Sequence, residues 1–235
     1  MSARRPIHLN PATDVAERVL LPGDPQRALA VAQALLEGPK MLNARRGLWG
    51  YTGIAPDGDL LTVQSSGIGG PSAAIVTEEL IDLGARTLLR IGTCGALSDA
   101  FEMGRLLAVR TALAYDGASR ALGAADRVEA DAELLDALVS AGGATPATVV
   151  STDLFYDPRE HLPGQWVAEG AVAVEMEAAA IFSVARSRGA RAGCLLAVTD
   201  LLAGGRKRMD QDSVEAVGVE LGAAALRALE ALSPR

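Results

Sequence analysis

The sequence predicts a single α/β domain in which helices cover both faces of a central β-sheet. Short apolar runs alternate along the chain with longer segments rich in helix-forming residues, which is the pattern of strands joined by crossover helices. The length of 235 residues fits one domain, and the apolar fraction of 49% is enough for a substantial core. The chain contains no repeat, linker or composition break, so we expect residues 1–235 to fold as one unit.

Apolar runs of strand length recur throughout the chain. Strands are predicted at residues 18–21, 50–54, 60–63, 87–95, 105–114, 148–151, 171–174 and 193–198. Asp57 and Gly58 form a turn signal between the second and third of these runs, which predicts a β-hairpin.

The helical segments are bounded by typical start and stop residues. Helices are predicted at residues 25–36, 72–83, 132–140 and 178–188, and a last helix carries the apolar stripe Val214, Val217, Leu221, Ala225, Leu229 and Leu232. Pro25 and Pro71 suit the first turns of the first two helices, and Gly189 ends the fourth. Residues 116–130 and 203–212 are polar and weakly patterned, so we expect both to be loops.

Composition and charge argue against several classes of protein. The net charge of −7 is unfavourable for binding nucleic acid or an anionic membrane. No apolar run approaches the roughly 20 residues of a membrane span, and residues 1–10 lack the apolar core of a signal peptide. Cys94 and Cys194 are too few for a disulfide framework or a metal knuckle. We therefore expect a cytoplasmic protein that holds no metal.

Two carboxylates mark the junction between a predicted strand and a predicted helix. Glu175 and Glu177 directly follow the apolar run at 171–174 and precede the helix at 178–188. In an open α/β sheet this junction borders the usual ligand crevice, where the two side chains are expected to converge on something placed there. The alternative is that both residues simply favour a helix N-terminus, where acidic side chains are common.

Arginines also occur at predicted strand ends. Arg90 lies inside an apolar strand and is followed by Gly92 and Thr93. A buried guanidinium is costly unless an anion meets it, and the neighbouring glycine and hydroxyl favour an oxyanion ligand over a structural salt bridge. A second anion site is predicted where Gly23 ends the first strand and Arg27 enters the next helix. A solvated arginine in an ordinary turn is the alternative for Arg27.

An acid and an aromatic pair complete the candidate site. Asp200 follows the apolar run at 193–198, and a partly buried carboxylate at such a strand end can act as a general acid. Phe155 and Tyr156 are adjacent in a chain that is only 3% aromatic. Together they can form a stacking wall for a flat ligand, although core packing is the usual role for either ring alone.

These motifs together resemble the nucleoside phosphorylase/uridine phosphorylase superfamily, and in particular its hexameric bacterial purine nucleoside phosphorylases. The resemblance runs over nearly the whole chain and implies a mixed central sheet that is partly closed. It is carried, in the family's order, by 21–25 with Arg27, Arg46-Gly47, 90–95, 153–156, 174–178 and Thr199-Asp200.

The resemblance implies phosphorolysis of a purine nucleoside to the free base and ribose 1-phosphate. Inorganic phosphate is then a co-substrate, and no cofactor is needed. The residues implied to bind phosphate are Gly23, Arg27, Arg46, Arg90 and Thr93. Those implied to bind the ribose are His8, Glu175, Met176 and Glu177. Those implied to surround the base are Gly92, Cys94, Phe155, Val174, Thr199 and Asp200.

By the same resemblance Asp200 is the general acid that protonates purine N7. Family members usually carry an arginine thirteen residues after this aspartate, where this chain has Ser213. We then expect Arg206 or Arg208 to assist proton transfer by Asp200 in place of that arginine, or this assistance to be absent. The departure leaves the preference between 6-amino and 6-oxo purines open.

The resemblance also implies a homohexamer, arranged as a trimer of dimers. His8 and Arg46 are then expected to reach the site of a neighbouring subunit. Taken alone, His8 near the chain terminus is interpreted as a surface histidine.

Three other functions share part of this pattern. A methylthioadenosine/S-adenosylhomocysteine nucleosidase uses water instead of phosphate, so the arginines argue against it. A uridine phosphorylase is expected to carry a glutamine/arginine pair near the aromatic loop, and residues 153–159 contain no such pair. A non-catalytic nucleoside-binding domain is the third alternative.

Overall fold

The structure, a computed structural model, describes residues 6–98 and 100–232. Its strands are β1 (Arg18–Pro22), β2 (Glu37–Asn43), β3 (Gly50–Ile54), β4 (Leu60–Gln64), β5 (Thr87–Ala96), β6 (Leu106–Tyr115), β7 (Arg127–Glu129), β8 (Thr145–Thr152), β9 (Ala173–Glu175), β10 (Arg191–Leu201) and β11 (Lys207–Arg208). Its helices are α1 (Pro25–Leu35), α2 (Gly70–Asp82), α3 (Gly117–Ala121), α4 (Ala132–Ser140), α5 (Leu162–Ala168), α6 (Ala178–Arg188) and α7 (Gln211–Leu232), and η1 (Arg45–Gly47) is a 3₁₀ turn.

The strands form one mixed sheet in the order β11-β10-β6-β8-β9-β5-β1-β4-β3-β2, and β7 pairs with β6. Strand β10 pairs with β5 as well as with β6, so that β5, β10, β6, β8 and β9 close into a ring. The expected α/β fold with a mixed and partly closed sheet is therefore confirmed. None of the described helices is both long enough and apolar enough to cross a bilayer.

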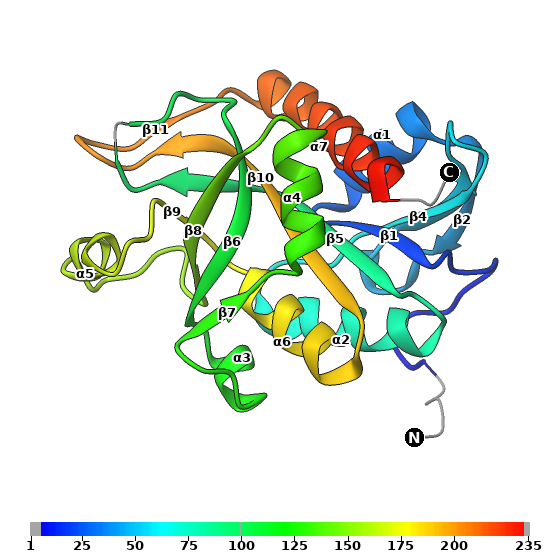
Figure 1. Ribbon diagram of the computed structural model, residues 1–235, viewed down its shortest axis with the longest axis horizontal. Helices are drawn as coiled ribbons and strands as arrows, with labels where there is room; N and C mark the ends of the chain where they lie inside the picture. Colours follow the sequence, from blue (N-terminus) through cyan, green and yellow to red (C-terminus); the bar gives the residue numbers. More distant parts are fainter. Residues whose placement is uncertain (1–5, 99, 233–235) are drawn as a thin grey trace.

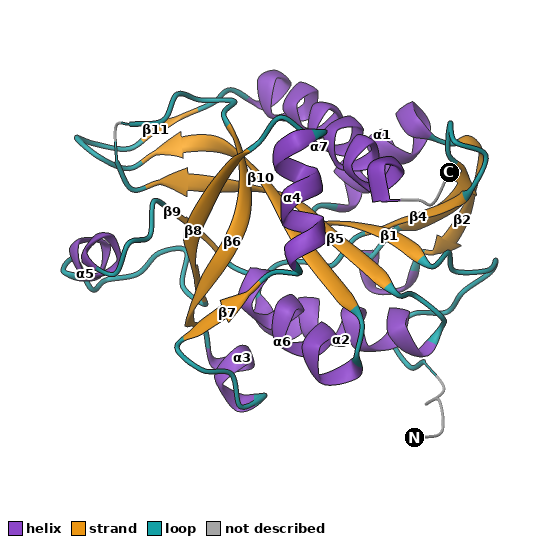
Figure 2. Cartoon of the chain, in the orientation of Figure 1, coloured by secondary structure: helices purple, strands orange, loops and turns teal. Residues whose placement is uncertain are grey.

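Helices cover the sheet on two sides. Figures 1 and 2 show α1, α4 and α7 on one side of the strands and α2, α3 and α6 on the other. Each side has its own buried apolar cluster, because alternate residues of a strand point to opposite faces. In β5, Leu88 packs on the side of α2 and α6, whereas Leu89 and Ile91 pack on the side of α1 and α7.

The expected loop at 116–130 is wrong, because it contains helix α3 and strand β7. The Asp116 side chain accepts a hydrogen bond from the backbone N–H of Ser119, which caps α3. Strand β7 pairs with the middle of β6, where Thr111 lies opposite Glu129. Both elements are too short to show a periodic pattern in the sequence. Short strand β11 likewise lies within the loop expected at 203–212.

Parallel pairing fixes where the candidate site lies. Strands β1 and β10 both run parallel to β5, so their carboxyl ends reach the same edge of the sheet. The register places Arg90 between Leu21 of β1 and Cys194 of β10. Residues that follow these strands therefore converge around the end of β5.

Candidate active site

A cavity of about 860 Å³ opens at the carboxyl ends of β1, β5, β9 and β10. Among the described residues, those that the sequence analysis assigned to phosphate, ribose, base or proton transfer border this cavity, except His8. The expected stacking wall of two rings is wrong for Tyr156, which is 88% exposed and lies outside the cavity, whereas Phe155 borders it. The sequence therefore predicted which distant segments meet, although their individual contacts follow only from the structure.

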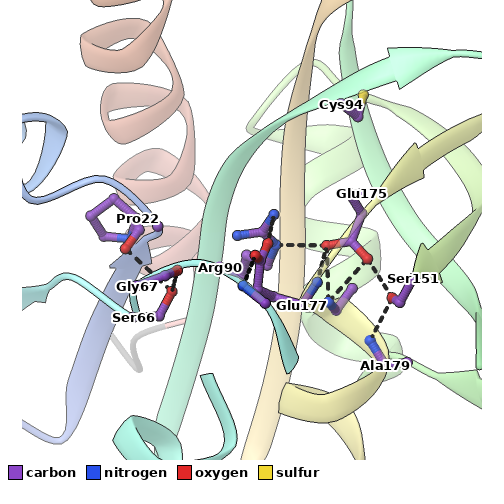
Figure 3. A network of polar contacts seen from close by, with 12 residues as sticks. Pro22, Ser66, Gly67, Arg90, Cys94, Ser151, Glu175, Glu177 and Ala179 are labelled. Carbon is purple, nitrogen blue, oxygen red and sulfur yellow. Dashed lines mark hydrogen bonds and ion pairs between the residues drawn. The ribbon is translucent and has the colours of Figure 1, made fainter. Parts of the chain in front are cut away.

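Arg90 is a buried cation held between two carboxylates (Figure 3). Its Nε donates to Oε2 of Glu175 at 2.9 Å, and its Nη2 lies 2.5 Å from Oε2 of Glu177. The third nitrogen, Nη1, has no hydrogen-bond acceptor among the described residues and lies on the side of Gly23. Arg90 thus makes structural ion pairs and still has one nitrogen available to an anion, so the two sequence interpretations are compatible.

Glu175 is enclosed by donors from its own chain. Its carboxylate accepts hydrogen bonds from the Ser151 hydroxyl, from Arg90 Nε and from the backbone N–H groups of Glu177 and Ala178. Its side chain is 0% exposed. This geometry departs from the expected contact with ribose, because both oxygens are already engaged. The structure instead has Glu175 orient Arg90 and the first turn of α6.

Glu177 has a different environment from Glu175. Its Oε1 accepts a hydrogen bond of 2.5 Å from the backbone N–H of Gly69, and Oε2 faces Arg90. Burial raises the pKa of the Glu177 carboxyl and the Glu175 charge adds to this, while Arg90 and the Gly69 N–H lower it; the net pKa lies above its ordinary value. Of the two carboxylates, Glu177 is the one with fewer protein donors at the cavity.

Arg27 lies beside Arg90 in the same cavity. Burial lowers the pKa of Arg27, Asp24 partly offsets this, and the nearby Arg90 charge lowers it further. The Arg27 side chain rests against helix α7, where a Cβ placed on Gly218 would lie 3.0 Å from Nε. Two guanidiniums whose charges repel each other in a partly buried cavity make a favourable environment for an anion.

Arg46 borders the cavity from the turn η1. Its backbone has φ 59° and ψ 16°, a left-handed conformation that is unusual for a residue other than glycine. The Asn43 side chain holds this turn by donating to Leu48 O at 2.6 Å and accepting from Arg45 N at 3.3 Å. Such backbone strain concentrates at functional sites. Arg46 thus borders the cavity of its own chain, and its expected role in the site of a neighbouring subunit stays a prediction.

Asp200 ends β10 with both carboxylate oxygens engaged. Arg206 donates from Nε to Oδ1 at 2.9 Å, its Nη2 forms an ion pair with the same oxygen at 2.8 Å, and the Thr199 hydroxyl donates to Oδ2 at 3.1 Å. The Arg206 guanidinium also lies 4.5 Å above the centre of the Phe155 ring. Arg208 pairs with Asp200 only through the backbone of β11, and its side chain does not contact the carboxylate. The geometry therefore favours Arg206 as the partner of Asp200.

The base region is built from the ends of β5, β9 and β10. Gly92, Cys94 and Val174 border the cavity there. Burial, with the nearby carboxylates, raises the pKa of the Cys94 thiol far above its ordinary value, so this thiol is a neutral wall. Phe155 is 52% exposed and faces the same space from the loop after β8.

His8 lies outside this cavity. Its Nδ1 is 2.7 Å from Oε1 of Glu79, a carboxylate on α2 that the sequence analysis did not single out. Ser151, which holds Glu175, was likewise missed. A signal existed for both, because Glu79 interrupts the apolar face between Val76 and Leu80, and Ser151 ends a buried strand.

The buried ion pair yields a stability prediction. We expect Glu175→Gln to lower the free energy of unfolding by about 3–5 kcal/mol, because it leaves the Arg90 charge undercompensated. The matched control is Glu133→Gln, which removes the 76% exposed partner of Arg191 and is expected to cost no more than about 1 kcal/mol. Chemical denaturation measures both, and equal losses for the two variants would contradict the role of Glu175.

Comparisons with known proteins agree with this architecture. Residues 17–233 match the family model described as the phosphorylase superfamily. The chain is 41% identical over 207 residues to a DeoD-type purine nucleoside phosphorylase of Jannaschia sp. (strain CCS1), covering 83% of this chain and 87% of that protein. It is 36% identical over 217 residues to a guanosine phosphorylase of Halorubrum lacusprofundi, covering 89% of each. A crystal structure of a uridine phosphorylase from Vibrio fischeri superposes with a TM-score of 0.81 at 28% identity, covering 93% of this chain and 91% of that one. The chain therefore belongs to the phosphorylase superfamily.

Proposed function

We propose that this protein is a purine nucleoside phosphorylase, which converts a purine nucleoside and phosphate into the free base and a pentose 1-phosphate. Relatives described as purine nucleoside phosphorylases support this activity. The main support from the structure is one observation. Arg27, Arg90 and Glu177 border a single cavity, so an anion and a sugar can be held side by side.

Phosphate binding rests on the arginines. Arg27, Arg46 and Arg90 all border the cavity, Nη1 of Arg90 lies on the side of Gly23, and Gly23 allows its backbone N–H to approach an anion closely. The Thr93 hydroxyl lies on the same wall. Several cationic donors around one dianion orient the phosphate oxygen that attacks the sugar carbon C1′.

Ribose binding rests on Glu177. Its carboxylate has fewer protein donors than that of Glu175 and can accept hydrogen bonds from the 2′- and 3′-hydroxyls, beside the backbone of Met176. A negative charge there also stabilises the positive charge that develops on the sugar as the glycosidic bond stretches. Because Arg90 contacts Glu177 directly, the phosphate and ribose sites share one ion pair.

The base departs with the electrons of the glycosidic bond. Asp200 gives a proton to purine N7, so that the leaving base is neutral, while a phosphate oxygen forms the new bond to C1′. Arg206 then stabilises the carboxylate that remains on Asp200. Phe155, Val174 and Cys94 provide the apolar walls for the ring. For the assembly, we keep the prediction of a homohexamer in which His8 serves a neighbouring subunit.

The decisive assay follows release of free base with and without inorganic phosphate. We expect adenosine, inosine or guanosine to be cleaved only with phosphate, and Asp200→Asn to lower kcat by about 10²–10⁴-fold, because the general acid is lost. Equal rates without phosphate would identify a nucleosidase, and preferential cleavage of uridine would identify a uridine phosphorylase. Nucleoside binding without any turnover would indicate a non-catalytic domain.

Arg206 and Arg208 form a matched pair for testing proton transfer. We expect Arg206→Gln to lower kcat by about tenfold, because it removes a charge-assisted hydrogen bond and an ion pair with Asp200, both weakened by partial exposure. Arg208→Gln, which removes a similar charge from the same loop, is expected to change kcat by less than about twofold. Similar losses in the two variants would reject the assignment of Arg206.

Gly218→Ala tests the phosphate site without changing its charge. The added Cβ displaces the Arg27 side chain, so we expect the KM for phosphate to rise by about three- to tenfold while the KM for the nucleoside stays nearly constant. Arg90→Ala is less suitable, because it would also release Glu177. The control is Gly164→Ala, another helical glycine, where nothing lies within 4 Å of an added Cβ and both KM values are expected to stay unchanged. An unaltered KM for phosphate in Gly218→Ala would contradict a role for Arg27.

A further inference from the structure

Glu79 gathers the N-terminal segment onto helix α2. Its Oε1 accepts hydrogen bonds of 3.0 Å from the backbone N–H groups of Ile7 and His8, and its Oε2 accepts one of 2.7 Å from Leu9. The His8 ring adds a contact of 2.7 Å between Nδ1 and Oε1. One carboxylate thus fixes both the backbone and the ring of His8.

This carboxylate lies in an apolar position. Glu79 lies on the same helix face as Val76 and Leu80, which are fully buried, and its own side chain is 11% exposed. Burial raises the pKa of the Glu79 carboxyl, but the hydrogen bonds from Leu9 and His8 outweigh burial and leave the pKa below its ordinary value. Glu79 is therefore an anion at neutral pH, and an anionic carboxylate can only accept hydrogen bonds.

The contact decides which nitrogen of His8 carries the proton. Since Glu79 accepts, Nδ1 must donate, and in the neutral ring Nε2 is then an unprotonated acceptor. The His8 side chain is 32% exposed, and no described residue other than Glu79 forms a hydrogen bond with its ring. His8 also lies outside the cavity of its own chain. The ring is therefore held rigidly with an acceptor available to a group from outside this chain.

We propose that Glu79 is a positioning residue, which sets His8 so that its Nε2 accepts a hydrogen bond from the 5′-hydroxyl of a nucleoside bound to a second copy of this chain. The inference rests on the proposed function, because it needs a nucleoside in the adjoining site. It adds a residue that does not touch the substrate and a reason for the choice of tautomer. A neutral nitrogen acceptor matches a hydroxyl donor, which a nucleoside lacking that hydroxyl cannot supply.

Paired substrates separate this role from simple anchoring of the segment. The assay compares kcat/KM for inosine and for 5′-deoxyinosine, or for the adenosine pair if adenosine is preferred. The variants are Glu79→Gln, His8→Ala and their combination. One neutral hydrogen bond contributes about 0.5–1.5 kcal/mol, so the wild-type protein is expected to favour the 5′-hydroxyl by about two- to tenfold.

We expect His8→Ala to abolish this preference, Glu79→Gln to reduce it by at least half, and the double variant to match His8→Ala. Non-additivity of this kind is the sign that Glu79 acts through His8. A purely structural role would instead lower activity on both nucleosides equally. That result, or a preference that persists in His8→Ala, would overturn the proposal.

A second measurement does not depend on turnover. His8 and His161 are the only histidines, so ¹⁵N NMR of the His161→Gln protein reports on His8 alone. We expect a protonated Nδ1 and an unprotonated Nε2 in the neutral ring, and loss of this bias in Glu79→Gln. The opposite tautomer would overturn the proposal even in a fully active enzyme. Conversely, the expected tautomer in a protein without phosphorolysis would place the failure in the proposed function, and the positioning role would fall with it.

Discussion

The ion pairs of Arg90 are the interaction on which the rest of the site depends. A guanidinium in the middle of a buried strand is tolerated only where anions meet it, and the segment that connects β9 to α6 brings two of them. Because Glu175 also binds the first amides of α6, the strand end, the helix start and β5 are tied together at one point. With Nε and Nη2 engaged, only Nη1 of Arg90 is available on the side of Gly23. A residue needed for structural cohesion thereby directs a donor into the cavity.

The two carboxylates show how environment separates identical side chains. Glu175 is saturated by a hydroxyl, a guanidinium and backbone amides, so it serves the framework. Glu177 has one backbone donor and shares Arg90, and its pKa is raised by burial. A carboxylate with fewer donors gains more from hydroxyl groups that a sugar brings. The pairing also means that any change at Arg90 acts directly on the Glu177 carboxylate.

Sequence alone could predict most of the elements and the meeting point of the site, but not β2 or α5, and not the pairings within the site. Turn and cap residues such as Pro25, Gly189 and the Asp57-Gly58 pair placed helix and strand boundaries correctly, because their conformational preferences are local. Helix α3 and strand β7 were missed because a cap at Asp116 and pairing with β6 create them, with little help from periodicity. The choice between Arg206 and Arg208 depends on how β11 turns back along β10, which no spacing reveals. The Glu79–His8 contact joins residues 71 positions apart and is equally invisible in the chain.

Arg206 contacts both the carboxylate of Asp200 and the ring of Phe155. This chain has Ser213 where members of the family usually have an arginine, and here Ser213 is engaged with Asp210 at the start of α7. The cation beside Asp200 comes instead from the loop directly after β10, and the same guanidinium lies on Phe155. Acid and aromatic wall are therefore linked through one side chain, since movement of the 153–157 loop would carry Arg206 with it or break its contact with the ring. In the proposed function, the aromatic wall of the base region and the general acid are therefore joined by a residue of the loop after β10 and not by one at the start of α7.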